Sequence, residues 1–198
     1  MLAYLSLACR FTQSPPPFLL ITHGVSGSGK SYVTSQLLAT LGAIRIRSDV
    51  ERKRLFGLNP LANSDSELNQ GLYTADAGAL TYQRLQELSG QILDAGYPVL
   101  VDATFLQLAQ RQAFRELADD RALPFVVLAC SADPATLRER VEQRKRRGED
   151  AAEADGAVLD QQLRHYAAPT AEENPLLVTD QDMEALTQEV LARVRNAR

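Results

Sequence analysis

The stretch Gly24-Val25-Ser26-Gly27-Ser28-Gly29-Lys30-Ser31 decides the fold of this chain. It fits the pattern G-x-x-x-x-G-K-[ST] and lies between an apolar, strand-like run at Phe18–Thr22 and a helical pattern at Ser31–Leu41. Glycines let backbone N–H groups approach a polyphosphate without a Cβ in the way, and the N-terminal end of a helix adds positive potential. The motif in this setting therefore predicts a phosphate-binding loop, the P-loop, between the first strand and the first helix of the domain.

The residues of this loop have separate expected roles toward a nucleoside triphosphate. Lys30 is expected to reach the β- and γ-phosphates and to act in catalysis, while the hydroxyl of Ser31 is expected to ligate magnesium. The nucleotide-binding set that we predict here also contains Gly24, Val25, Ser26, Gly27, Ser28, Gly29 and Tyr32. ATP and Mg2+ are the expected ligands, and the loop leaves the choice between ATP and GTP open.

Strand-like and helical patterns alternate along the rest of the chain. Further strands are predicted at 43–47, 97–101, 124–130 and 175–179, and further helices at 49–56, 74–95, 107–121, 134–147, 158–166 and 183–194. Strands separated by helices imply a parallel sheet that is covered on both faces. We therefore expect an α/β three-layer sandwich of the P-loop NTPase type, with a mostly parallel five-stranded sheet and a helical lid. Ligands of such sheets bind at the carboxyl ends of the strands.

The composition limits the partners of the chain. It has 198 residues and a formal net charge of −4, so it lacks an overall attraction to nucleic acid or anionic lipid. No stretch approaches the roughly 20 apolar residues that span a bilayer, and we expect no membrane association. Cys9 and Cys130 lack the spacing of metal ligands, which favours a reduced, cytoplasmic location.

Several classes of P-loop protein are excluded by missing motifs. A guanine-nucleotide switch would carry an Asn-Lys-x-Asp motif for base recognition, and the sequence has none. The stretch Leu88-Ser89-Gly90-Gln91 is only a shortened form of a transporter signature, and we interpret it as ordinary helix surface. Asp102 is followed by Ala103 and not by a catalytic glutamate. A small kinase is the class that remains.

An acid and an arginine follow the second predicted strand, in the segment Ser48-Asp49-Val50-Glu51-Arg52. A spacing of three residues puts Asp49 and Arg52 on one helix face. Asp49 is then placed to orient or deprotonate an acceptor hydroxyl, and Arg52 to hold a phosphate or the substrate. The alternative is an Asp that caps the helix beside a solvated Arg.

A second acid ends the apolar strand Val99-Leu100-Val101-Asp102. This strand end is the expected place for a carboxylate that holds magnesium through water, which is the role we predict for Asp102. The alternative is an acidic turn or cap residue.

Basic residues crowd the end of the predicted helix at 134–147. The cluster contains Arg138, Arg140, Arg144, Lys145, Arg146 and Arg147. Arginines on a mobile lid could close over the nucleotide and neutralise charge in the transition state. Because helix dipoles also favour cations at this end, a solvated basic face is the alternative for any single arginine.

Three ring-bearing residues near the predicted site have no assigned chemistry. His23 lies at the end of an apolar run, so we expect a packed histidine. Tyr73 and Tyr82 flank the expected acceptor side, where each could stack on a ring or fill the core.

With these residues in view, the chain resembles the small P-loop kinases grouped around phage polynucleotide kinase, zeta toxins and gluconate kinase. It is most similar to the predicted-kinase branch described as an AAA-type ATPase domain. The resemblance covers about residues 18–179. Its anchors are the P-loop, Ser48-Asp49-x-x-Arg52, the segment 96–105, Leu137-x-x-Arg140-x-x-x-Arg144, the segment 150–154 and Leu159-x-x-Gln162.

The resemblance implies roles for four of these residues. The acid matching Asp49 is the general base toward the acceptor hydroxyl, and the arginine matching Arg52 contacts substrate or phosphate. Arg140 and Arg144 match lid and hinge arginines, so both join the predicted nucleotide-binding set and Arg144 also joins the catalytic set. The chain departs from the family at Ala152, where a serine is usual, and at Tyr32, where a threonine is usual.

The resemblance also implies a domain organisation. Residues 1–17 are expected to form an N-terminal helix and a proline-rich linker, and residues 18–198 a P-loop kinase domain. In that domain we expect acceptor-side helices at about 50–95 and a lid at about 140–158. The segment 3–18 looks like the linker to an aminoglycoside-phosphotransferase-like domain in bacterial two-domain proteins. We therefore hypothesise that the chain is the carboxyl-terminal part of such a protein or a stand-alone relative.

The leading functional hypothesis is an ATP-dependent phosphotransferase that acts on a small hydroxylated acceptor. One alternative is a polynucleotide 5′-hydroxyl kinase, for which nucleic acid would be the partner. That enzyme needs a positive groove, and the acidic chain offers only the basic cluster of the lid. The other alternative is a regulatory ATP-binding or ATPase domain without an acceptor. No motif in the sequence names the acceptor, the oligomeric state or the lid arginine that contacts the γ-phosphate.

Overall fold

The computed structural model describes residues 15–59, 74–147, 154–178 and 183–196. In this part of the chain, five strands form one sheet in the order β2-β3-β1-β4-β5. All four neighbouring pairs run parallel. The predicted α/β class and five-stranded sheet are therefore confirmed, and the described sheet is parallel throughout.

The strands and helices follow the alternation that the sequence predicts. The strands are β1 (Leu19–His23), β2 (Ile44–Arg47), β3 (Val99–Asp102), β4 (Phe125–Cys130) and β5 (Leu176–Val178). The helices are α2 (Lys30–Leu41), α3 (Ser48–Leu55), α4 (Ala75–Asp94), α5 (Leu108–Asp119), α6 (Pro134–Arg147), α7 (Gly156–Arg164) and α8 (Met183–Asn196), with a 3-10 turn at Ala171–Glu173. The helix predicted near the N-terminus, the segment 60–73 with Tyr73, and the lid segment 148–153 lie outside the described residues.

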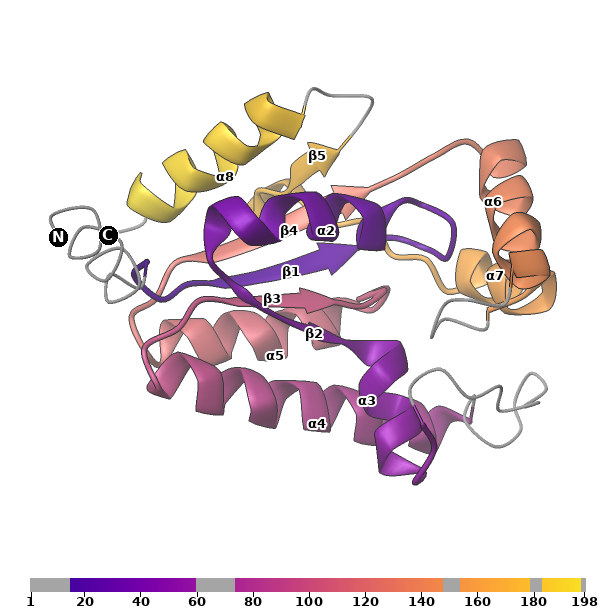
Figure 1. The fold of residues 1–198 in the computed structure, drawn as a ribbon, viewed down its shortest axis with the longest axis horizontal. Helices are drawn as coiled ribbons and strands as arrows, with labels where there is room; N and C mark the ends of the chain where they lie inside the picture. The colour runs from indigo at the N-terminus through magenta and orange to yellow at the C-terminus, as the bar shows by residue number, and fades with distance from the viewer. Residues whose placement is uncertain (1–14, 60–73, 148–153, 179–182, 197–198) are drawn as a thin grey trace, which may run out of the picture.

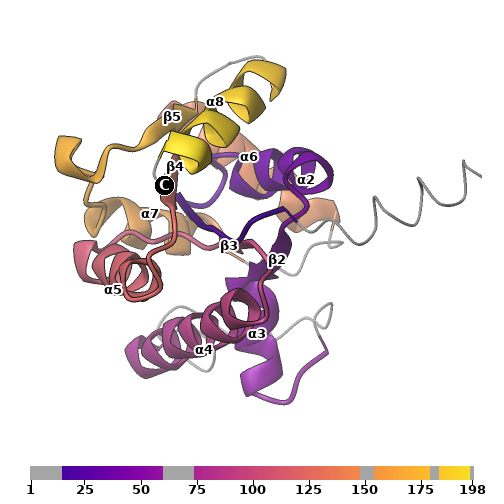
Figure 2. The same cartoon turned by 90° about the vertical axis from the view of Figure 1, so that its left-hand side faces the viewer.

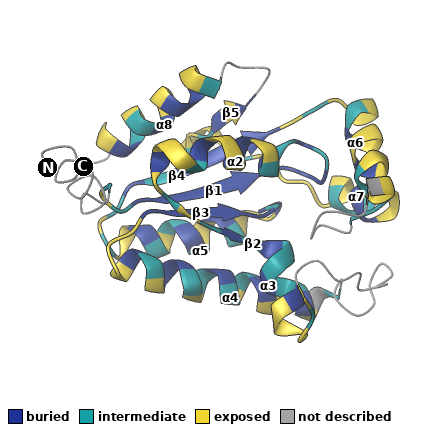
Figure 3. Cartoon of the chain, in the orientation of Figure 1, coloured by how far each residue is buried: buried dark blue, intermediate teal, exposed yellow. Residues whose placement is uncertain are grey.

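Helices cover both faces of the sheet (Figures 1 and 2). Helices α2 and α8 lie on one face, while α4 and α5 lie on the other. Successive residues of β1 alternate between the two layers: Leu20 packs in the cluster that contains Leu37 and Val190, and Ile21 packs in the one that contains Leu85. Because both faces are covered, all five residues of β1 are buried, as the dark blue strand in Figure 3 shows. This double burial explains why the strand has a continuous apolar sequence.

The strand order opens a crevice at the carboxyl end of β1. From β1 the chain passes outward to β2, returns to β3 beside β1, and then crosses to β4 on the other side of β1. Such a reversal is where ligands bind in open parallel sheets, because the loops on its two sides diverge. The P-loop fills this position between β1 and α2.

Helices α6 and α7 lie beyond the carboxyl end of the sheet, next to the P-loop (Figure 1). They form a small core of their own, in which Val25 of the P-loop packs with Leu137, Val141 and Leu159. A Cβ on Gly27 would lie only 2.7 Å from the carbonyl oxygen of Leu137. The described parts of the segment predicted as the lid, 140–147 and 154–158, belong to or adjoin these two helices, which pack directly on the P-loop and are called the lid helices below. Its middle, 148–153, lies outside the described residues.

Within the described ranges, none of the helices combines the length and the apolar character that a bilayer crossing requires.

Candidate nucleotide-binding site

Two glycines give the P-loop its shape. Gly24 has a φ of 140° and Gly27 a φ of 84°, values that residues with a side chain rarely adopt. A Cβ on Gly24 would lie 2.3 Å from the carbonyl oxygen of Cys130. The loop is also tied to the end of β3, because the Gly24 amide donates to the carbonyl oxygen of Thr104 at 3.0 Å. The glycine pattern that identified the loop is thus needed both for its conformation and for its close packing.

The N-terminal end of α2 is open to an anion. Its N-cap is Gly29 in the left-handed region, and no side chain caps the first amides. The side chain of Lys30 is buried within the loop, where its Nζ donates to the carbonyl oxygen of Val25 at 2.7 Å. Burial lowers the pKa of Lys30, and the Asp102 carboxylate opposes that shift. Free helix amides and a buried ammonium group fit the phosphates of a nucleotide.

A chamber of about 160 Å3 opens at the carboxyl ends of the strands. Its wall combines the P-loop with α3, the end of β3, α6 and α7. The lining residues are Ser26, Lys30, Ser31, Ser48, Asp49, Arg52, Asp102, Ala103, Thr104, Arg144, Ala154, Val158, Gln161 and Gln162. The structure thus brings together every residue that the sequence predicts as catalytic or as a magnesium ligand.

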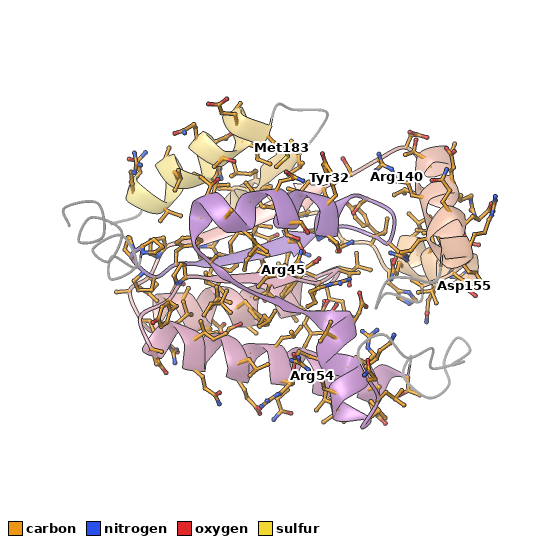
Figure 4. All side chains as sticks on the ribbon, viewed as in Figure 1. Tyr32, Arg45, Arg54, Arg140, Asp155 and Met183 are labelled. Carbon is orange, nitrogen blue, oxygen red and sulfur yellow. The ribbon has the colours of Figure 1, made fainter. Side chains whose placement is uncertain are left out.

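A second hollow, the outer cleft, lies on the other side of the P-loop and has a volume of about 480 Å3. Figure 4 shows Tyr32, Arg140 and Met183, which come from α2, α6 and α8, around this opening. Its other lining residues are Ser28, Gly29, Val33, Ser131, Ala132, Asp133, Thr136 and Val178. Eight of the predicted nucleotide-binding residues are therefore divided between two hollows. Gly24 and Gly27 line neither of them, and the Val25 side chain packs against α6 and α7.

The two predicted magnesium ligands are neighbours. Asp102 is buried, and a hydrogen bond joins its carboxylate to the Ser31 side chain. Thr34 donates to its Oδ2 at 3.4 Å. Burial raises the pKa of Asp102, while Lys30 and the Ser31 hydrogen bond lower it. Among the residues with described positions, no three His, Cys, Asp or Glu side chains form a metal-binding group. A magnesium ion here would take most of its ligands from phosphates and water, as is usual for nucleotide sites.

Asp49 and Arg52 lie in α3 and face the chamber together. The Asp49 Oδ1 atom is 4.0 Å from Nη1 of Arg52, and its Oδ2 atom is 4.0 Å from Nη2 of Arg47. The N-cap of α3 is Arg47, and no side chain caps this helix. Asp49 therefore does not cap α3, contrary to the alternative interpretation of this residue.

The basic cluster divides into two groups. Arg140 donates to the carbonyl oxygen of Gly27 at 3.2 Å, and Arg144, which lines the chamber, donates to that of Ala154 at 3.1 Å. Three other members form ion pairs with acids. Arg146 pairs with Glu142 on α6, Lys145 with Asp155 at the start of α7, and Arg138 with Asp160 within α7. The basic-face alternative thus describes these three, while Arg140 and Arg144 lie at the P-loop and the chamber.

Two of the ring-bearing residues, His23 and Tyr82, are packed in the core, while Tyr73 lies outside the described residues. His23 is buried, its Nδ1 lies 3.0 Å from the carbonyl oxygen of Phe105, and burial lowers its pKa to about 4. Tyr82 packs edge-on against the Phe105 ring and accepts a hydrogen bond from the Phe105 amide. The packed-histidine prediction is confirmed, and Tyr82 fills the core.

One prediction about the helix surface is wrong. Ser89 and Gly90, in the stretch that resembles a shortened transporter signature, are buried in α4. The Ser89 hydroxyl donates to the Leu85 carbonyl oxygen at 2.7 Å. A Cβ on Gly90 would lie 3.3 Å from Nη2 of Arg121, beyond the end of α5. Small residues at these positions allow α4 to pack closely.

Arg47 and Gln162 are among the residues at the site to which the sequence assigned no role. Arg47 lies opposite Asp102 in the register of β2 and β3, and the strand-end rule could have identified it. Gln162 accepts a hydrogen bond from the Ser26 amide at 2.7 Å. The motif Leu159-x-x-Gln162 is present in the sequence, but no local pattern indicates that Gln162 contacts a residue 136 positions away.

Comparison with known proteins agrees with this geometry. The chain is 27% identical over 156 residues to the uncharacterized protein Rv2004c of Mycobacterium tuberculosis, a match that covers 79% of this chain and 31% of the relative. The chain thus spans about a third of the length of the curated relatives it matches.

Solved structures of P-loop kinases and a related protein share the fold. Kti12 of Chaetomium thermophilum in complex with ADP-AlF3 has a TM-score of 0.69 at 18% identity, over 90% of this chain and 98% of that one. A gluconokinase of Sinorhizobium meliloti has a TM-score of 0.59 at 22% identity, over 93% and 94%. The profile of a family described as an AAA domain, AAA_33, matches residues 19–169. With its P-loop, parallel sheet and paired lid helices, the chain belongs to this AAA domain family and has the fold of the P-loop kinases.

Proposed function

We propose that this chain is an ATP- and Mg2+-dependent phosphotransferase that moves the γ-phosphate to a hydroxyl of a small-molecule acceptor. One observation carries the proposal: the acid Asp49 shares the chamber of about 160 Å3 with Lys30, Ser31 and Asp102. A site that only held a nucleotide would not need a further acid opposite the P-loop. Likeness to a gluconokinase and to Kti12 bound to ADP-AlF3 supports the nucleotide side of this proposal.

The two hollows suggest how the nucleotide lies. The outer cleft, which contains Tyr32 and Arg140, suits the base and ribose. The phosphates would follow the loop past Gly29 to Lys30, and the γ-phosphate would reach the chamber. Both hollows adjoin the same loop, so a single extended triphosphate can occupy them together.

In the chemical step, the acceptor hydroxyl oxygen bonds to the γ-phosphorus while the bond from this phosphorus to the β–γ bridging oxygen breaks. Asp49 accepts the hydroxyl proton, and ADP leaves with the electron pair of the broken bond. Lys30 and Arg144 line the chamber and would stabilise charge on the phosphoryl oxygens. When bound, magnesium would be held by Ser31 and, through water, by Asp102, and would neutralise phosphate charge.

The lining of the chamber favours a small polar acceptor. Besides the P-loop, it presents Ser48, Arg52, Thr104 and Gln161, and none of its described lining residues has an aromatic ring. A polynucleotide kinase would gain from aromatic rings that stack on bases and from a positive groove. The 5′-hydroxyl kinase is therefore the less favoured alternative. A regulatory ATPase without an acceptor is the second alternative, because the P-loop side of the site is by itself sufficient to hold a nucleotide.

The domain organisation is part of the same proposal. We assign residues 18–198 to the kinase unit, with acceptor contacts from about 50–95 and the lid at about 140–158. The match to about a third of each curated relative is compatible with fusion to a further domain, such as an aminoglycoside-phosphotransferase-like one.

The test is a screen of metabolites and oligonucleotides for acceptor-dependent release of ADP from Mg·ATP. With the acceptor found, Lys30→Ala is expected to abolish ATP turnover. Asp49→Asn is expected to retain ATP binding and to lower transfer by about 100-fold or more, because the acceptor proton loses its base. Asp119→Asn, at the exposed end of α5 and outside the chamber, is the matched control. ATP hydrolysis without any phosphorylated product would favour the regulatory alternative, and full transfer by Asp49→Asn would exclude its role as base.

A further inference from the structure

One amide of the P-loop is bound by a side chain of the lid. The Ser26 amide donates to Oε1 of Gln162 at 2.7 Å, although 136 residues separate them in the sequence. Because a backbone N–H needs an acceptor, this contact fixes which end of the Gln162 amide faces the loop. The oxygen is directed to Ser26, so the NH2 group at the other end keeps two protons to donate.

The position of Gln162 places this NH2 group at the phosphate end of the site. Gln162 lines the chamber together with Ser26, Lys30 and Ser31, whereas it does not line the outer cleft. With the base in the outer cleft, the triphosphate ends in the chamber. The γ-phosphoryl group then lies within the set of residues that line the chamber, and Gln162 is one of them.

Helix α7 holds Gln162 in place from two directions. On one side Leu159 is fully buried in the cluster with Val25, Leu137 and Val141. On the other side, the chain after α7 is anchored because Arg111 donates to the carbonyl oxygen of Ala167 at 3.1 Å. A side chain on such a fixed helix loses little entropy when it binds a ligand, which is the requirement for a positioning residue.

We infer that Gln162 is the residue that distinguishes ATP from ADP in this site: its oxygen holds the P-loop at Ser26 and its NH2 group donates to an oxygen of the γ-phosphoryl group. The inference rests on the proposed function, since it assumes a nucleotide in the P-loop. It adds a contact by which the lid detects the phosphate that is to be transferred. Transfer of that phosphate would leave the NH2 group without its partner, while the contact of the oxygen with the Ser26 amide would remain.

The test compares the dissociation constants of Mg·ATP and Mg·ADP by calorimetry, for which no acceptor is needed. In Gln162→Glu an oxygen still accepts from the Ser26 amide, but a negative charge replaces the NH2 group. We expect Mg·ADP binding to change less than about threefold and Mg·ATP binding to weaken about tenfold or more, as for a lost hydrogen bond to a charged group. Gln162→Met, which lacks both polar groups, is expected to weaken both nucleotides and to weaken ATP more.

Gln143→Glu is the matched control, because it adds the same charge to the exposed side of α6, outside both the chamber and the outer cleft. Equal losses of ATP and ADP affinity in Gln162→Glu would overturn the inference, and so would an equal loss of ATP affinity in Gln143→Glu. Should Gln162→Glu not fold, Gln162→Met must still weaken the binding of Mg·ATP more than that of Mg·ADP. A wild-type protein that binds neither nucleotide would instead contradict the proposed function itself.

Discussion

The Nε atom of Arg47 lies 3.7 Å from the Oδ2 atom of Asp102. The two residues are opposite each other at the ends of neighbouring strands, β2 and β3. Arg47 also lies 4.0 Å from a carboxylate oxygen of Asp49. One cation therefore lies beside both the proposed base and the proposed magnesium-holding acid, and it offsets the repulsion between them.

We predict that Arg47→Met raises the magnesium concentration needed for ATP binding. Burial already raises the pKa of Asp102, and Arg47 is one of the groups that lower it. Without this cation the Asp49 and Asp102 carboxylates repel each other uncompensated and Asp102 is held less well toward the metal-bound water, so we expect about a tenfold rise in the half-saturating Mg2+ concentration. Calorimetric titration of ATP at several free Mg2+ concentrations measures this value.

The control for this variant is Arg121→Met, which removes an arginine that lines neither the chamber nor the outer cleft. The Nε atom of Arg121 donates to Oδ1 of Asp94 at 2.7 Å. Arg121→Met should leave the magnesium dependence unchanged. Arg47→Lys, which keeps the charge, should restore most of the wild-type behaviour. An Arg47→Met protein with wild-type magnesium dependence would show that Arg47 does not support Asp102.

A second prediction concerns stability at acid pH. His23 is buried and its pKa is lowered from 6.5 to about 4, chiefly by burial. The unfolded chain takes up this proton below about pH 6.5 and the folded chain only near pH 4, so His23 makes stability fall as the pH drops through this window. Between pH 7.5 and pH 5 the loss is about 2 kcal/mol. Urea unfolding of wild type and His23→Asn at both pH values measures it.

Asn at position 23 keeps an N–H donor for the Phe105 carbonyl oxygen but does not titrate in this range. The difference between the two proteins therefore isolates His23 from other titrating groups, such as Asp102. We expect the variant to lose less stability than the wild type on acidification. The same loss in both proteins would show that His23 is protonated without cost in the folded state.

The sequence predicts the features that depend on local patterns. The P-loop motif, the apolar strands and the acids at strand ends require only a few consecutive residues, and each lies where the fold rules put it. Asp49 and Asp102 are far apart in the chain, yet the rule that ligands bind at strand ends was enough to bring them together. Element boundaries differ from the predicted ones by at most two residues.

The features that the sequence did not predict depend on long-range packing. The pairing of Arg138 with Asp160 and the burial of Ser89 depend on how neighbouring helices meet. The contact from Ser26 to Gln162 likewise requires that α7 return to the P-loop. A basic cluster or a helical pattern has the same appearance in the sequence whichever side faces a neighbour. For this reason the sequence does not show which lid arginines contact the P-loop or the chamber and which form ion pairs on the helix surface.

A third prediction concerns the ion pair that anchors the chain after α7. Arg111 is 1% exposed, and its Nε and Nη2 atoms donate to the two carboxylate oxygens of Glu173 at 2.6 and 3.0 Å. Its Nη1 atom also donates to the carbonyl oxygens of Phe105 and Ala167. Arg111→Met leaves these acceptors without a donor, and we expect a loss of about 3–5 kcal/mol in the free energy of unfolding. Urea unfolding at neutral pH measures the loss.

The double variant Arg111→Met/Glu173→Leu tests the cause. Removing both charges avoids an unpaired buried carboxylate, so this protein should be more stable than the single variant. The matched surface control is Arg121→Met, which breaks the exposed pair with Asp94 and should cost less than about 1 kcal/mol. A single Arg111 variant as stable as the wild type would show that the pair does not anchor this segment.

The last prediction concerns the contact between the P-loop and the lid. In Gly27→Ala the new Cβ meets the Leu137 carbonyl oxygen at 2.7 Å, and a φ of 84° is unfavourable for alanine. The loop and α6 must move apart, so ATP affinity should fall about tenfold or more, together with a loss of stability of about 1–3 kcal/mol. Gly57→Ala is the control, because its φ is 71° but nothing lies within 4 Å of the added Cβ. It shares the backbone strain without the clash and should keep wild-type ATP affinity. Equal ATP affinity in the two variants would mean that the lid helix does not need its close approach to Gly27.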